Sequence, residues 1–508
     1  MNFVSLAFII FLISTFIIYF ITPKKYEWIV LLIASFIFYI WANWYFALYL
    51  LASIAVTYSA AMLIAKYDDE KKKNWILAAS IFINIGILFV VKYLNFTITT
   101  AVGVLNKFSL DVAFNGLNIL LPIGLSFYTF QSIAYVVDVK REMIEPQKNI
   151  FKYALFVSFF PQILQGPIGR YETLAPQLYE GHDFSYENFF KGAQRIILGF
   201  FKKIVVADFV GLFVNTVFAN PDKAYGFVGV FGAIGYAIQL YADFSGFMDI
   251  AIGTSKVLGI ELDENFNTPY LSKSIAEYWR RWHITLGAFF RDYIYYPILR
   301  TKTSKKLLTL KNRKLGKNIA TLISLLVTWA LIGIWHGANW TYLLHGLYYG
   351  VIISSSILLE PFYKKVNDKI KIKDNIKDIF RIIRTFIIVC FGYILFRSES
   401  LTAFGTYLSS MFSGSGFTEL RYFSSVFGTT YLLSVFYVIH VVAGCLVWGV
   451  VQHRMNRLNT IDFETRIAKK YRLEAIIISA ILVLITIATY IAVSTVGGHQ
   501  VGFIYYDF

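Results

Sequence analysis

The sequence predicts an all-α protein that lies in a membrane, built as a polytopic helical bundle. The first observation is composition, because 57% of the 508 residues are apolar and the mean hydropathy is +0.59. The second is that long apolar runs recur from one end of the chain to the other, and a spanning helix needs about 20 such residues. We therefore expect about 11 to 13 membrane segments, including re-entrant and interfacial helices where Gly and Pro interrupt a run.

The apolar runs account for most of the chain. They lie near residues 3–22, 27–41, 44–65, 75–97, 117–139, 151–167, 188–215, 225–256, 317–335, 339–359, 378–396, 424–452 and 473–495. The first run lacks a basic leading region and a small-residue cleavage site, which favours a retained anchor over a signal peptide. No soluble module or Pro-rich linker separates the runs, so the sequence predicts one membrane domain over residues 1–508.

Positive charge lies in the loops between these runs, and the net charge is +16. Basic loops mark the cytoplasmic side of a membrane protein, so the charge indicates topology and no nucleic-acid partner. Alternating these loops with the runs places both termini outside the cell. The basic stretches lie near residues 66–73, 140–148, 300–317, 364–377 and 453–472. The two cysteines, Cys390 and Cys445, fall in apolar runs and are expected to be packing residues.

One histidine interrupts the apolar sequence at the seam between two runs. His336 lies in Trp335-His336-Gly337-Ala338-Asn339-Trp340, where Gly337 and Asn339 favour a helix break. A titratable side chain at membrane depth is costly and indicates function by default. Imidazole suits a general base, although a structural histidine bonded to a backbone carbonyl is an equal alternative. The flanking basic loops place His336 toward the outer half of the membrane.

A second histidine, His283, lies in a segment rich in charge and aromatic residues. Arg280 and Arg281 precede it, and its nearness to Arg300 in the sequence places it toward the cytoplasmic side. The two histidines are thus expected to face one internal site from opposite sides of the membrane. The alternative for His283 is an anchor at the level of the lipid headgroups. His345 lies nine residues after His336; on one continuous helix it would point elsewhere, which favours packing. A metal site is not expected.

Two carboxylates, Asp243 and Asp249, lie inside an apolar run and must be paired or face water. Ion pairing with Arg170, Arg280, Arg281 or Arg291 is favoured over direct catalysis. The stretch from Pro161 to Arg170 contains two Pro and two Gly, which predicts a kink or a re-entrant turn. Its polar residues, Gln162, Gln165 and Arg170, are expected to line a cavity. No P-loop, dinucleotide-binding or nucleophile-elbow motif is present.

Four segments together resemble the membrane-bound O-acyltransferase family, and more narrowly its bacterial branch for alginate and peptidoglycan O-acetylation. They are Phe159–Arg170, Tyr241–Asp249, Tyr278–Leu286 and Trp335–Trp340. The resemblance implies a bundle with a thinned centre and a passage through it, and a catalytic core over about residues 117–360. It implies acetyl-CoA arriving from the cytoplasm, with the acetyl group leaving outside. It further implies that His336 is the principal catalytic histidine and His283 a second one, with Trp335 and Asn339 beside them.

The chain ends Phe503-Ile-Tyr-Tyr-Asp-Phe508, which fits a Phe-x-Tyr-x-x-Phe ending associated with the family. By this resemblance Tyr505, in an extracytoplasmic tail over residues 496–508, is an acyl relay; an aromatic anchor is the equal alternative. The charge of Asp507 departs from the pattern.

No domain for binding sugar chains is visible, so a separate extracytoplasmic SGNH-type acetyltransferase is the expected partner. The acceptor is a polysaccharide, such as alginate, cellulose or peptidoglycan, outside a bacterial cytoplasmic membrane. Two other function classes remain open from the sequence. They are a polysaccharide or small-molecule transporter without acyl chemistry, and a lipid O-acyltransferase.

Overall fold

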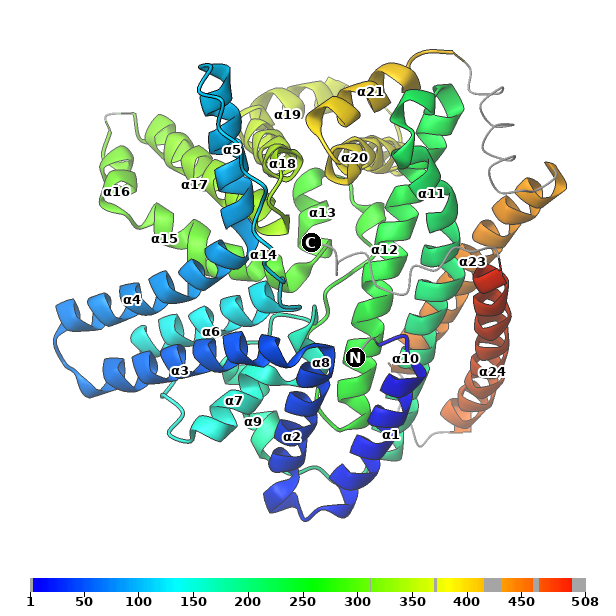
Figure 1. Cartoon of the computed structure of the whole chain (residues 1–508). Helices are drawn as coiled ribbons and strands as arrows, with labels where there is room; N and C mark the ends of the chain where they lie inside the picture. Colours follow the sequence, from blue (N-terminus) through cyan, green and yellow to red (C-terminus); the bar gives the residue numbers. More distant parts are fainter. Residues whose placement is uncertain (1–2, 311, 370–371, 415–430, 460–465, 496–508) are drawn as a thin grey trace. The chain divides into compact units, whose positions relative to one another are not determined.

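The protein is helical in all the parts that the structure describes (Figure 1). A computed structural model describes residues 3–310, 312–369, 372–414, 431–459 and 466–495. Among these residues the only extended pairing is an isolated antiparallel bridge between Phe266 and Trp282. The predicted all-α fold class is therefore confirmed.

The described chain divides into two compact units. The first contains residues 21–181 and 263–386. Its helices are α2 (Lys24–Ala42), α3 (Trp44–Lys66), α4 (Glu70–Leu88), η1 (Phe89–Tyr93), α5 (Leu94–Lys107), α6 (Leu125–Lys140), α7 (Ile150–Ser158), α8 (Phe160–Ile163), α9 (Tyr171–Tyr179), η4 (Pro269–Leu271), α13 (Ile275–Arg281), α14 (Ile284–Phe290), η5 (Arg291–Tyr295), α15 (Tyr296–Leu299), α16 (Lys302–Leu308), α17 (Arg313–His336), α18 (Trp340–Leu358) and α19 (Glu360–Lys369).

The second unit contains residues 2–20, 182–262 and 387–508, of which only the described parts are considered. Its helices are α1 (Leu6–Ile21), α10 (Tyr186–Phe201), η2 (Lys202–Asp208), α11 (Phe209–Ala219), η3 (Pro221–Lys223), α12 (Gly226–Val257), α21 (Leu401–Met411), α23 (Tyr431–Asn459) and α24 (Arg466–Thr495). Helix α20 (Asp374–Arg397) begins in the first unit and ends in the second.

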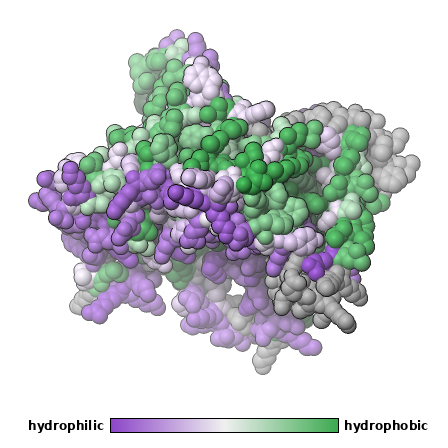
Figure 2. Space-filling model, turned by 90° about the horizontal axis from the view of Figure 1, so that it is seen from below, coloured by the Kyte–Doolittle hydropathy of each residue, from purple (hydrophilic) through white to green (hydrophobic). Residues whose placement is uncertain are grey.

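Eight helical segments within the described residues are long and apolar enough to cross a membrane. They are 24–42, 44–66, 70–107, 226–257, 313–336, 340–358, 374–397 and 471–491. Large apolar side chains are exposed along several of them, as at Ile33 and Trp41 on α2 or Phe380 and Ile387 on α20. On the face drawn in Figure 2, hydrophobic side chains likewise occupy wide areas of surface. Apolar exposure on this scale is expected of side chains that face lipid.

The remaining apolar runs form shorter or interrupted helices. Residues 151–167 give α7 and α8, after which residues 164–170 are irregular and largely buried. This confirms the break predicted from the Pro and Gly residues of that stretch. Three helical runs also contain π-helical segments, η1, η2 and η5. A π-helical turn widens a helix by one residue and is frequent at functional sites.

Candidate functional site

His336 is the last residue of α17, at the point where the chain reverses into α18. Only residues 337–339 join the two helices, and the Asn339 side chain caps α18 by accepting a hydrogen bond from the Thr341 backbone nitrogen at 3.1 Å. The predicted helix break is confirmed, and Asn339 acts in it as an N-cap. The imidazole of His336 is buried, with 4% of the residue exposed.

Glycine lets α17 and α18 approach closely just before this turn. A Cβ atom on Gly333 would collide with the Tyr342 carbonyl oxygen, and one on Gly346 would collide with the Trp329 carbonyl oxygen. Both obstacles are backbone atoms, which cannot move aside as a flexible side chain would. The close crossing fixes the backbone on both sides of His336.

The indole of Trp335 brings the two predicted histidines into one site. The ring centroid of Trp335 lies 4.8 Å from that of His336 and 6.0 Å from that of His283. Phe127 on α6 packs against both Trp335 and His283, with ring centroids 5.6 and 6.3 Å away. Both histidines thus lie beside one indole within the first unit.

The placement of the two histidines toward opposite faces of the membrane was wrong. The hydrocarbon core of a bilayer is about 30 Å thick, so two rings beside one indole lie at similar depth. The predicted depth of His283 rested on its nearness to Arg300 in the sequence. This inference failed because α14, η5 and α15 form an unbroken helical run from Ile284 to Leu299. At about 1.5 Å per residue this run carries the chain roughly 24 Å from His283 to the basic loop.

His283 is held by an unusual backbone conformation and by Asn265. Its φ of 47° lies in the left-handed region, which is uncommon outside glycine and is found at functional sites. The Asn265 side-chain oxygen lies 3.3 Å from His283 Nδ1 and accepts hydrogen bonds from the backbone nitrogen and the hydroxyl of Thr285, each at 3.0 Å. Since a carboxamide oxygen only accepts, Nδ1 carries the proton.

In the neutral ring, the remaining nitrogen of His283, Nε2, holds the lone pair. The irregular stretch after α8 supports this arrangement, because the Ile168 backbone nitrogen donates to the Thr285 hydroxyl at 3.0 Å. The predicted turn at residues 161–170 therefore reaches His283 indirectly. Ile168 binds Thr285, and Thr285 binds Asn265, which in turn contacts the ring of His283.

His345 lies closer to the site than the sequence indicated. Its ring centroid is 6.3 Å from that of His336 and 4.9 Å from that of Tyr349, and the residue is buried. The argument from helical phase was wrong because the turn at residues 337–339 reverses the chain between the two histidines. Among the described residues, no group of three or more His, Cys, Asp or Glu side chains is placed to hold a metal ion.

Sequence reasoning also missed Lys92, which reaches the end of α17. Its Nζ atom donates to the Trp335 carbonyl oxygen at 2.7 Å. The signal was present, because Lys92 lies inside the apolar run 75–97 and a charge at membrane depth indicates function. The rule that selected His336 selects Lys92 as well.

The basic residues predicted for the site are engaged elsewhere in the first unit. Arg170 pairs with Asp292 at 2.7 Å and lies over the Tyr293 ring, 4.6 Å from its centroid. Arg281 pairs with Glu277 at 2.7 Å, and Arg280 is exposed. Gln165 is buried, and its side-chain oxygen has no hydrogen-bond partner within the described chain. The side-chain oxygen of Gln162 is likewise buried without a hydrogen-bond partner among the described residues.

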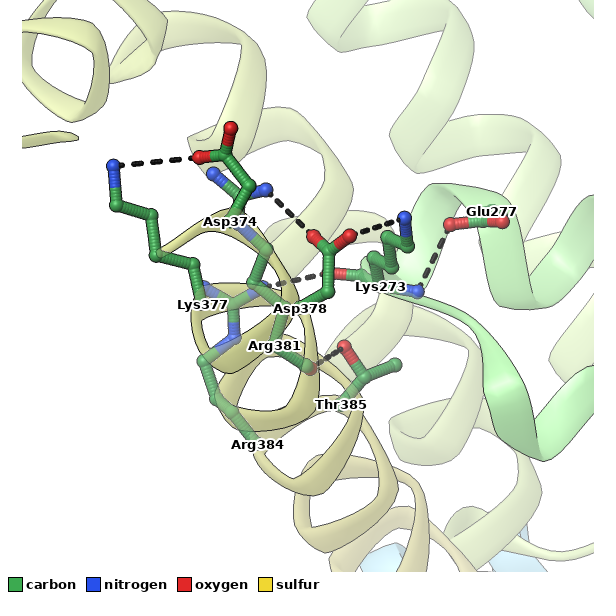
Figure 3. Close-up of polar contacts among 8 residues, drawn as sticks. All are labelled: Lys273, Glu277, Asp374, Lys377, Asp378, Arg381, Arg384 and Thr385. Atoms are coloured by element: carbon green, nitrogen blue, oxygen red, sulfur yellow. Dashed lines mark hydrogen bonds and ion pairs between the residues drawn. The ribbon is translucent and has the colours of Figure 1, made fainter. Parts of the chain in front are cut away.

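A network of charged side chains holds the segment that leads into α13 and His283 (Figure 3). Lys273 pairs through Nζ with Asp378 on α20 at 2.6 Å. Its backbone oxygen accepts from Arg384 at 3.0 Å, and its backbone nitrogen donates to Glu277 at 2.9 Å. Glu277 also binds Arg281. Arg281, which the sequence analysis expected at the site, therefore belongs to this supporting network.

Asp243 and Asp249 lie on α12 in the second unit, where both are ion-paired. Asp243 binds Lys203 at 2.8 Å, and Asp249 binds Lys202 and Arg195, the latter at 3.0 Å. The predicted pairing is confirmed, but the recorded partners differ from the arginines proposed for it. Lys203 also binds Asp208 at 2.7 Å. Tyr505 lies outside the described residues.

Comparison with known proteins places this arrangement in a family. The model of the membrane-bound O-acyltransferase family matches residues 147–398, which include both histidines beside Trp335. The probable alginate O-acetylase of Pseudomonas syringae is 34% identical over 398 residues, which cover 78% of this chain and 72% of the relative. The chain belongs to the membrane-bound O-acyltransferase family.

Two further relatives act on other cell-envelope polymers according to their names. The peptidoglycan O-acetyltransferase of Helicobacter pylori is 32% identical over 355 residues, covering 64% of this chain and 63% of the relative. The teichoic acid D-alanyltransferase of Bacillus subtilis is 31% identical over 292 residues, covering 56% of this chain and 70% of the relative. The protein is thus a membrane-embedded O-acyltransferase, and a transporter without acyl chemistry is no longer an alternative.

Proposed function

We propose that this enzyme carries an acetyl group from cytoplasmic acetyl-CoA to the outer side of a bacterial cytoplasmic membrane, for O-acetylation of a polysaccharide. The observation that carries the proposal is the pair of buried imidazoles, His336 and His283, on either side of Trp335. Two imidazoles beside one indole can move protons during acyl transfer. The names of the alginate and peptidoglycan relatives favour acetyl as the group transferred.

The chemistry requires one base and a path for one proton. His336 takes the proton of the attacking hydroxyl while the hydroxyl oxygen bonds to the thioester carbonyl carbon. The carbon–sulfur bond then breaks, and the proton on the imidazole passes to the leaving thiolate of coenzyme A. A positioned general base of this kind contributes on the order of 100- to 10,000-fold to the rate. His283 accepts a hydrogen bond from the same substrates through Nε2.

The distribution of basic residues along α17 supports entry of acetyl-CoA from the cytoplasm. Arg313, Lys314 and Lys317 lie at the start of this helix, and His336 lies at its end. Twenty-four residues span about 36 Å, which is enough to cross the hydrocarbon core. Basic residues favour the cytoplasmic side, so His336 lies toward the outer side and both termini lie outside the cell.

Three further parts of the proposal come from the family resemblance. A passage through a single domain over residues 1–508, with its core near 117–360, lets donor and acceptor reach the buried imidazoles. Tyr505, in the extracytoplasmic tail, receives the acetyl group on its phenolic oxygen and presents it outside. A separate SGNH-type acetyltransferase then moves it to the polymer, an alginate-like exopolysaccharide or peptidoglycan.

The test of the donor uses the purified protein in lipid vesicles with acetyl-CoA labelled in the acetyl group. We expect free coenzyme A thiol to be released in proportion to label that becomes ester-bound. Palmitoyl-CoA serves as the comparison donor, and we expect it to react at least tenfold more slowly. Faster release from palmitoyl-CoA, with the acyl chain recovered in lipid, would instead establish a lipid O-acyltransferase.

A further inference from the structure

The end of α17 is held by two adjacent residues from another helical run of the first unit. Lys92 Nζ donates to the carbonyl oxygens of Trp335, at 2.7 Å, and of His336, at 3.4 Å. The Tyr93 hydroxyl donates to the carbonyl oxygen of Ile334 at 3.0 Å. Three consecutive carbonyls, including that of His336 itself, thus receive donors from residues 92 and 93.

These carbonyls belong to the last turn of α17, and that of Ile334 also accepts from the Gly337 backbone nitrogen at 3.2 Å. The last four carbonyl groups of an α-helix have no donor within it, and the helix dipole places partial negative charge there. A lysine ammonium satisfies both conditions, because a cation at this end of a helix is stabilising. No carboxylate pairs with Lys92 in the part of the chain that the structure describes. The partial negative charge at the end of α17 therefore balances the charge of the ammonium.

A π-helical segment places both residues within reach. The run from Glu70 to Lys107 is α-helical except at η1, residues Phe89–Tyr93. Adjacent residues of a regular α-helix point about 100° apart, but in η1 Lys92 and Tyr93 both reach α17. Lys92 also lies 6.0 Å from the centroid of the Trp335 ring. A local departure from the α-helix thus faces the histidine site, as is common for π-helical turns.

We propose that Lys92, assisted by Tyr93, is a positioning residue that fixes the end of α17 and thereby the ring of His336. The inference rests on the proposed function, in which His336 is the base. Lys92 touches neither substrate nor reacting atoms in this account; it acts through the backbone of Trp335 and His336. Small displacements of a catalytic group matter, because a shift of about 1 Å can lower a rate on the order of 100-fold.

The test replaces Lys92 by methionine, which keeps an unbranched side chain and removes the donor and the charge. We expect kcat for acetyl transfer to fall about 10- to 100-fold, with the KM for acetyl-CoA changed less than about threefold. Lys92→Arg should recover part of the loss, because it restores charge and donors with a different geometry. Lys107→Met, at an exposed lysine of the same helical run, is the matched control and should behave as wild type.

A second measurement follows the backbone directly, by hydrogen exchange of the peptide spanning residues 330–340. Lys92→Met should raise its exchange, and Lys107→Met should not. Should Lys92→Met fold poorly, Tyr93→Phe removes only the bond to Ile334 and should still raise exchange. Unchanged exchange in both variants, or wild-type kcat in Lys92→Met, would overturn the positioning role.

The two proposals fail separately. If His336→Ala retains transfer while Lys92→Met still loosens residues 330–340, His336 is not the base and only the backbone contact stands. If His336→Ala is inactive and neither Lys92→Met nor Tyr93→Phe alters the exchange, the base is correct and the positioning role is not.

Discussion

Replacing His336 by alanine should lower kcat for acetyl transfer by about 100- to 10,000-fold, the usual contribution of a positioned general base. The ring is buried at the end of α17 against Trp335, so bulk water is poorly placed to replace it as proton acceptor. The measurement is the rate of coenzyme A thiol release from acetyl-CoA by the purified variant in vesicles.

The control for this experiment is another histidine of the same chain. His453 is exposed at the end of α23, and His453→Ala should retain the wild-type rate. Both variants should show the same thermal unfolding in detergent, so that a lost rate reflects chemistry. A rate for His336→Ala within tenfold of wild type would remove His336 as the base, since a structural histidine would then account for its burial.

The largest effect on stability is expected from Lys203→Met in the second unit. Its ammonium binds both Asp243 and Asp208, and Lys203 and Asp243 are almost completely buried, each with 1% of the side chain exposed. Removing one partner of a buried ion pair leaves an uncompensated charge and costs about 3–5 kcal/mol. Thermal unfolding of the detergent-solubilised variant should therefore begin at a clearly lower temperature than that of wild type.

Lys256 provides the matched control in the same unit. It pairs with Glu261 at 3.0 Å, but 74% of the Glu261 side chain is exposed. An exposed pair contributes about 0–1 kcal/mol, so Lys256→Met should unfold nearly as wild type does. The double variant Lys203→Met/Asp243→Leu should regain part of the stability, because it removes one of the charges left behind. Equal unfolding of Lys203→Met and Lys256→Met would show that the buried ion pair does not hold η2 against α12.

The sequence predicted the fold class well because apolar run length alone decides which segments a membrane can hold. Each of the runs named from the sequence overlaps a helix in the described chain. The breaks at residues 161–170 and 337–339 were also predictable, because Pro, Gly and Asn have known local preferences. His336 was selected by the cost of placing a titratable group at membrane depth, which does not depend on knowing the fold. His283 was named as a second catalytic histidine through the family resemblance.

The contacts between helices could not be predicted in the same way. Asp243 and Lys203 lie 40 residues apart on different helices, and spacing along the chain carries no information about that approach. His345 was placed away from the site by assuming a continuous helix across a three-residue turn. The predicted depth of His283 was wrong because a long helical run separates this residue from the basic loop. Residues that are near in sequence can lie far apart when a helix joins them.

The central claim is that one buried imidazole serves a thioester from one side of the membrane and a hydroxyl from the other. The most direct test reconstitutes the protein in sealed vesicles and supplies acetyl-labelled acetyl-CoA on one side only. We predict that label is recovered, as ester or acetate, in the compartment that never held coenzyme A, and that His336→Ala abolishes this recovery. Label that stays on the side of the donor, or that crosses equally well in His336→Ala, would contradict the claim.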